Sequence, residues 1–159
     1  MKLKYLWIVL LLLLALLISA CGGGETEEEP STGQEAEQSI SLTDLSPIER
    51  GELWATEYGC IGCHSTDGSQ ISGGGPTWLN VFGSEELLDD DTSVTVDEPY
   101  LIKSILDPGS QTVSGYLKGV MEDTFEAQFE FKEKNMLEDE GLEVDIVSDL
   151  VAYIQSLAE

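Results

Sequence analysis

Two cysteines and a histidine stand close together in the segment YGCIGCHSTDG, residues 58–68. Cys60 and Cys63 are three residues apart, and His64, the only histidine of the chain, follows directly. A zinc site would need a fourth ligand, and the sequence has no second Cys or His pair to supply it. A redox-active dithiol would be expected in a βαβ setting, which the sequence does not predict. The group therefore indicates a cofactor that brings ligands of its own.

The spacing C-x-x-C-H is typical of covalent haem c attachment. Two thiols three residues apart in a helical turn can each add to one vinyl group of the same porphyrin, and the next residue places an imidazole at the iron. We therefore expect Cys60 and Cys63 to form the thioethers and His64 to be the proximal ligand. One motif predicts one covalently bound haem.

The sixth iron ligand must come from elsewhere in the chain. Because there is no second histidine, bis-histidine ligation is excluded, and methionine is the usual alternative. Met121 lies in SGYLKGVMEDTF, a loop-like stretch with two glycines that could bring a thioether to a flat cofactor. Met136 is flanked by charges and is expected in a helix or at the surface. Met121 is thus the predicted distal ligand, and an open sixth site is the alternative.

The first 20 residues predict an export signal. The apolar run over residues 6–17 is shorter than the roughly 20 residues that a membrane span needs. It ends in LISAC, where Cys21 follows small residues, which resembles the lipobox of bacterial lipoproteins. Lipid on Cys21 would hold the protein at a membrane. A plain secretory signal with an incidental cysteine, or an uncleaved anchor, is the alternative.

An acidic, flexible tether over residues 21–45 is expected to join the lipidated cysteine to a folded domain at 46–159. The formal net charge of the chain is −24, and losing Lys2 and Lys4 with the signal takes it to −26. Such a charge argues against nucleic acid and anionic lipid as partners. It favours a basic partner or a high-salt habitat. A heavily solvated surface with no docking role would give the same net charge.

The domain is predicted to be all-α. We expect helices at 46–59, capped by Ser46, at 97–108, capped by Asp97, and at 143–159. A few alternating β-branched residues before the second helix suggest a small excursion with a turn. The last helix carries one apolar face at helical spacing, formed by Val147, Leu150, Val151, Ile154 and Leu157.

These features together resemble the class I c-type cytochromes. The likeness is closest to the cytochrome c domain of subunit II of some bacterial haem–copper oxidases, and extends to lipid-anchored monohaem subunits such as that of alternative complex III. It rests on GELWATEYGCIGCHSTDGS, GGGPTWLNVFG, VTVDEPYLIKSILDPG, SGYLKGVM and DLVAYIQSL. The resemblance implies a class I cytochrome c fold, in which the N- and C-terminal helices cross beside one haem.

The resemblance also implies roles for residues outside the attachment motif. The backbone carbonyl of Pro76 would accept a hydrogen bond from the imidazole of His64 and fix its orientation. Met121 would be the distal ligand. Trp78 and Tyr116 would line the haem or contact its propionates, unless they are ordinary core aromatics.

Two departures from the family pattern stand near the distal ligand. The family usually has proline after the ligating methionine, whereas this chain has Glu122. The segment 122–143 is longer than the usual link to the last helix, and we expect it to add a helix or flap near the distal side. The chain also lacks the membrane helices and copper site of an oxidase subunit II.

The expected function is electron transfer without catalytic residues of its own. A Met/His haem is six-coordinate and exchanges single electrons. The protein would work at the outer, extracytoplasmic face of a bacterial cytoplasmic membrane, with redox proteins or a membrane electron-transfer complex as partners. A quinol-oxidising complex, a terminal oxidase and a photosynthetic chain are the settings considered. The alternative is a haem-based ligand sensor or a peroxidase-like enzyme with an open sixth site.

Overall fold

The computed structural model describes residues 41–71, 73–121 and 125–158. The predicted signal, the predicted lipidation site Cys21 and the tether up to residue 40 lie outside the described residues. The chain divides into two units, Met1–Gln38 and Ser39–Glu159, and the described residues all belong to the second. Within them, no helix has the length and apolar character needed to cross a membrane.

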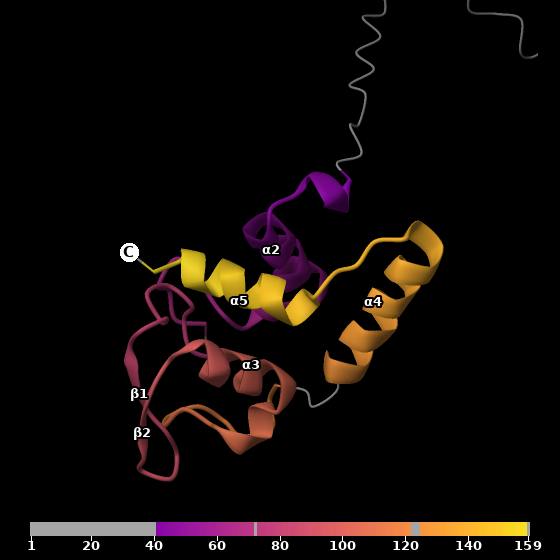
Figure 1. Ribbon diagram of the computed structural model, residues 1–159. Coiled ribbons are helices and arrows are strands. Elements are labelled where there is room, and N and C mark those ends of the chain that lie inside the picture. Colours follow the sequence, from indigo (N-terminus) through magenta and orange to yellow (C-terminus); the bar gives the residue numbers. More distant parts are fainter. Residues whose placement is uncertain (1–40, 72, 122–124, 159) are drawn as a thin grey trace, which may run out of the picture. The chain divides into compact units, whose positions relative to one another are not determined.

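The described residues form four α-helices and one two-stranded antiparallel sheet (Figure 1). The helices are α2 (Pro47–Glu57), α3 (Glu98–Leu106), α4 (Phe125–Glu140) and α5 (Ile146–Ser156). The strands are β1 (Glu85–Leu87) and β2 (Ser93–Thr95), and three short 3₁₀ turns are η1 (Leu42–Asp44), η2 (Cys60–Gly62) and η3 (Pro108–Ser110). The sheet lies in the stretch where alternating β-branched residues suggested a turn with some extended structure. It adds a β-hairpin to the domain, which was expected to be all-α.

Local capping signals determine where α2 and α3 begin. The hydroxyl of Ser46 accepts a hydrogen bond from the backbone N–H of Glu49 (3.3 Å), and the carboxylate of Glu49 accepts one from the N–H of Ser46 (2.8 Å). This reciprocal pair satisfies two amide donors that the first turn would otherwise leave unpaired. Asp97 likewise accepts from the N–H of Tyr100 (2.8 Å) at the start of α3. Both predicted helices and both predicted caps are confirmed.

Helices α2 and α5 cross at close range and pack against each other (Figure 1). Gly51 permits this approach, because a Cβ at that position would run into the carbonyl oxygen of Asp149 and the Cβ of Tyr153. The predicted apolar face of the last helix is present, with Leu150 and Ile154 buried. The crossing therefore joins the two ends of the domain around a shared core.

A partly buried ion pair, Arg50 with Asp149, links the two crossing helices. Asp149, whose side chain is 4% exposed, accepts hydrogen bonds from Nε and Nη2 of Arg50 at 2.7 Å each. The indole N–H of Trp54 donates to the same carboxylate at 3.2 Å, and Arg50 also donates to the Leu45 carbonyl at 2.9 Å. The charge of Asp149 is thus compensated by three donors, which is what a buried carboxylate needs.

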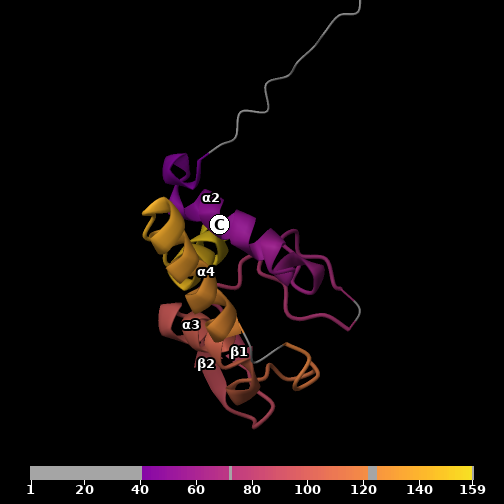
Figure 2. The ribbon, with the colours of Figure 1, turned by 90° about the vertical axis from the view of Figure 1, so that its right-hand side faces the viewer.

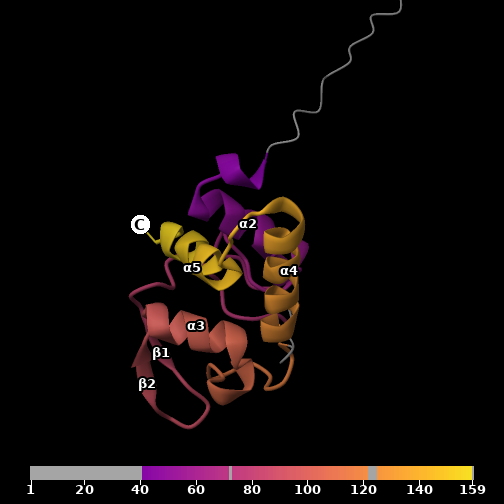
Figure 3. The same ribbon diagram turned by 45° about the vertical axis from the view of Figure 1, so that its right-hand side comes forward.

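The segment expected to form a helix or flap contains the 16-residue helix α4, which packs against α3 and α5 (Figure 2 and Figure 3). Phe129 and Met136 are buried, and their spacing of seven residues places them on one face of the helix. Met136 thus lies in a helix, one of the two positions expected of it, and it is buried there rather than exposed at the surface. Lys132 pairs with Glu57 of α2 at 3.0 Å, so α4 is also tied to the first helix.

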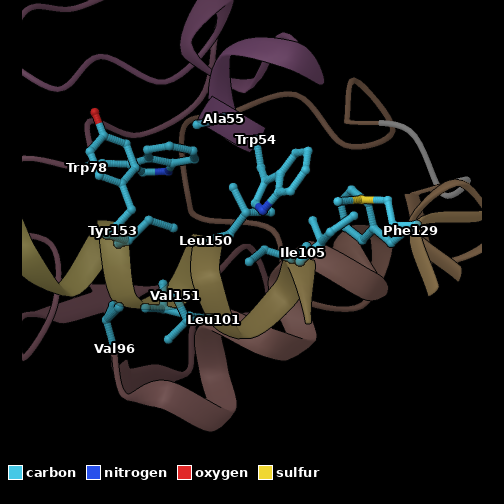
Figure 4. Close-up of a cluster of buried hydrophobic side chains, with 13 residues drawn as sticks. Trp54, Ala55, Trp78, Val96, Leu101, Ile105, Phe129, Leu150, Val151 and Tyr153 are labelled. Atoms are coloured by element: carbon cyan, nitrogen blue, oxygen red, sulfur yellow. The ribbon is translucent and has the colours of Figure 1, made fainter. Parts of the chain in front are cut away.

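The main hydrophobic core is assembled from all four helices and the segments between them (Figure 4). Its members are Trp54, Ala55, Trp78, Val96, Leu101, Ile105, Phe129, Met136, Ile146, Leu150, Val151, Tyr153 and Ile154. Trp78 is the core member that stacks on His64 of the CIGCH motif, and it connects this core to the site described next.

Candidate functional site

The CIGCH motif forms a tight turn immediately after α2. Gly59, at a φ of 72°, starts the turn in the left-handed conformation that glycine adopts without strain. The N–H groups of Cys63 and His64 both donate to the carbonyl of Cys60, at 3.1 and 2.9 Å. Both cysteines are free thiols, Cys60 half-buried and Cys63 exposed, and burial raises the pKa of the Cys60 thiol. The turn keeps the two thiols and the imidazole in one short segment.

The imidazole of His64 is held by one hydrogen bond that also sets its tautomer. Nδ1 lies 2.8 Å from the backbone carbonyl oxygen of Pro76. A carbonyl can only accept, so Nδ1 carries the proton and Nε2 keeps its lone pair. Burial lowers the pKa of His64, whereas the hydrogen bond to Pro76 raises it. The burial effect is the larger, which favours the neutral ring that can act as a ligand.

The glycine-rich loop folds back along the motif and forms the other side of this arrangement. The N–H of Gly75 donates to the carbonyl of Cys63 (2.9 Å), and the N–H of Trp78 donates to the carbonyl of Ser65 (2.8 Å). A Cβ at Gly75 would collide with the ring of His64. Only glycine therefore allows the loop to pass this close to the imidazole.

Trp78 forms a flat support for the histidine ring. The indole and imidazole rings are stacked, with centroids 5.0 Å apart and 16° between their planes. Tyr153 of α5 packs edge-on against the indole of Trp78, with the two ring centroids 6.3 Å apart. Trp78 is 8% exposed, so it is a core aromatic and a wall of the site at the same time.

A cavity opens beside the motif, bounded by the turn, the glycine-rich loop, β1, α3 and the 111–121 segment. Its volume is about 240 Å³, a little below the roughly 300–1,000 Å³ of typical small-molecule sites, and its mouth is open to solvent. The predicted site residues within the described part all line it, namely Cys60, Cys63, His64, Pro76, Trp78, Tyr116 and Met121. Met136 is absent from this lining and belongs to the core.

The cavity has further wall residues that sequence reasoning missed. Tyr100 and Ser104 come from one face of α3, and their spacing of four residues is the signal that could have paired them. The side-chain amide of Gln111 donates to Ser104 Oγ (3.0 Å) and to the Tyr100 carbonyl (3.3 Å). Glu86 of β1 and Phe125 of α4 complete other parts of the wall. These residues are brought together only by the tertiary fold.

The described residues contain no group of three or more His, Cys, Asp or Glu side chains placed to hold a metal ion. Comparison of the sequence with models of known protein families found no match, and comparison with curated proteins found none either. The case for a function therefore depends on the chemistry of the residues that line the cavity.

Proposed function

We propose that this chain is a membrane-anchored, monohaem c-type cytochrome with the class I fold, which carries single electrons in a respiratory or photosynthetic chain. The observation that carries the proposal is the shared cavity. Two thiols, an imidazole with a free ring nitrogen and a thioether, from Cys60, Cys63, His64 and Met121, line one space although Met121 lies more than fifty residues further along the chain.

The residues present fit a haem c by the chemistry of the donor set. Each thiol would add across one vinyl C=C bond, its sulfur bonding to one carbon and its proton going to the other. His64 would bind the iron through Nε2, because Nδ1 is committed to the Pro76 carbonyl. The cavity wall is largely apolar, as a porphyrin requires, and Gly75 leaves room for the ring of His64.

Electron transfer follows from full coordination. A bound haem supplies the one-electron Fe(III)/Fe(II) couple. With His64 and Met121 both as ligands, the iron keeps no vacant position for a substrate. The hydrogen bond to Pro76 and the stacked Trp78 hold the proximal imidazole in one orientation. A site with fixed ligands changes little between its two oxidation states, which suits a carrier.

The packing of α2 against α5, with α2 ending just before the CIGCH turn, supports the class I fold, since the family resemblance implies crossed terminal helices at the haem. Lipid on Cys21 would keep the carrier at the outer face of a bacterial cytoplasmic membrane, either as a shuttle or as a subunit of a quinol-oxidising or terminal oxidase complex. A Cys21→Ser variant should then leave the membrane fraction and appear in the soluble extracytoplasmic fraction.

The haem assignment is tested by producing the chain in a host that matures c-type cytochromes. The haem should stay with the polypeptide after denaturation, and the oxidised protein should show a methionine–iron charge-transfer band. Met121→Ala should abolish that band, while Met136→Ala should keep it. The control removes a buried side chain and is expected to cost about 2–5 kcal/mol of stability. A high-spin spectrum of the unmodified protein would contradict electron transfer and favour the sensor or peroxidase-like alternative.

A further inference from the structure

The wall of the cavity carries a single formal charge among the described residues. Glu86 lines the cavity, and none of the other described lining residues is an aspartate, glutamate, lysine or arginine. The remaining polar side chains of the wall are hydroxyls, an amide, the thiols of Cys60 and Cys63 and the neutral imidazole of His64. A carboxylate in such a wall has no fixed cation facing it from the same surface.

The geometry of β1 places this carboxylate on the cavity side of the strand. Successive side chains of a strand point to opposite faces. Glu85 and Leu87 are exposed, while Glu86 between them is half-buried and lines the cavity. Burial raises the pKa of the Tyr100 phenol, and the nearby charge of Glu86 raises it further. Glu86 therefore lies close to another wall residue, on α3, rather than out in solvent.

We propose that Glu86 tunes the iron, holding the reduction potential of the haem lower than the same pocket would without that charge. This inference rests on the proposed function. Ferric haem carries one more positive charge than ferrous haem, so a nearby carboxylate stabilises the oxidised form more than the reduced one. In a partly buried wall the effect is screened less than at the surface. With no lysine or arginine among the described wall residues, nothing in that wall cancels it.

The chain offers a matched control in the neighbouring glutamate. Glu86→Gln and Glu85→Gln remove the same charge from adjacent positions of one strand, one facing the cavity and one facing solvent. Reduction potentials of both holoproteins would be measured by spectroelectrochemical titration at low and at high salt. Glu86→Gln should favour the reduced form by a factor on the order of ten, which is about 59 mV for a one-electron couple. Glu85→Gln should give a smaller shift that high salt removes.

A second variant, Glu86→Ala, separates the loss of charge from any new hydrogen bond of the glutamine, and it should raise the potential in the same direction. Equal shifts from Glu86→Gln and Glu85→Gln, or a Glu86→Gln shift that high salt abolishes, would overturn the role of Glu86 while leaving the haem assignment intact. Failure of the unmodified chain to bind haem covalently would instead overturn the proposed function, and the tuning role with it.

Discussion

The imidazole of His64 lies on the indole of Trp78, with ring centroids 5.0 Å apart and planes 16° apart. Trp78 belongs to the buried core that α2 and α5 share, and Tyr153 of α5 braces its edge. The imidazole of His64 therefore packs directly against the core. A change in the packing of α2 and α5 is expected to alter the position of this imidazole, which would bind the iron.

Replacing Trp78 should loosen both the core and the ring that it supports. Trp78→Ala is expected to cost about 3–5 kcal/mol in the free energy of unfolding, whereas Trp78→Phe keeps an aromatic face and should cost clearly less. Urea unfolding of the two variants beside the parent protein measures the difference. Equal losses for the two variants would mean that an aromatic ring at this position supports neither the core nor the imidazole.

A methyl group at Gly75 should displace the imidazole. Gly75→Ala puts a Cβ into the space of the His64 ring and is expected to cost about 1–3 kcal/mol through overpacking. The spectrum of the proposed haem should change, because His64, its proposed proximal ligand, can no longer keep its position. Gly62→Ala is the matched control, since nothing lies within 4 Å of a Cβ at that position. A parent-like spectrum and stability for Gly75→Ala would contradict the close approach.

The ion pair of Asp149 should matter far more than an exposed pair of similar type. Asp149→Ala leaves Arg50 and the indole of Trp54 without their acceptor, and breaking a buried pair in this way costs about 3–5 kcal/mol. Glu138→Ala removes the partner of Lys134 on the solvent side of α4, where the side chains are 62% and 69% exposed. That loss should be at most about 0.5 kcal/mol. Thermal or urea unfolding of both variants compares them, and similar losses would argue against the Asp149 network.

Alkaline pH should destabilise the protein in part through Tyr58. Burial raises the pKa of Tyr58 to about 12, whereas an unfolded chain ionises its tyrosines near about 10. Between these values the unfolded chain has released a proton that the folded one keeps. The contribution of Tyr58 to the free energy of unfolding should therefore be constant below about pH 10 and fall as pH rises from about 10 to about 12. Tyr58→Phe should show a shallower fall in the free energy of unfolding over this range. An identical slope in both proteins would place the ionisation elsewhere.

The helix boundaries were predictable where the signals are local. Ser46 and Asp97 each precede a helix and accept an amide hydrogen bond three residues later, so their side chains specify a helix start without tertiary contacts. The burial of one face of α4 was harder to predict. Its sequence is charged on most sides, and the burial of Met136 follows from its position one heptad after Phe129, which flanking charges obscured.

The candidate site was predictable as a set of residues but only partly as an arrangement. The motif and the resemblance indicated Cys60, His64 and Met121, and the structure places all three around one cavity. The stacking of His64 on Trp78 and the inward position of Glu86 depend on how the loop and β1 fold back. No local pattern encodes such contacts, because they arise between segments that meet only in the finished fold.

The crossing of α2 and α5 also has a consequence for the order of events during synthesis. The helix that precedes the CIGCH turn finds its main packing partner at the far end of the chain. A chain that emerges N-terminus first thus presents Cys60 and Cys63 long before residues 146–156 are available to complete the core. For the proposed haem attachment, that delay would leave both thiols accessible on an unfolded segment, the state in which an attachment enzyme could reach them. The slow closure of the chain between α2 and α5 would then give time for haem attachment before the domain folds.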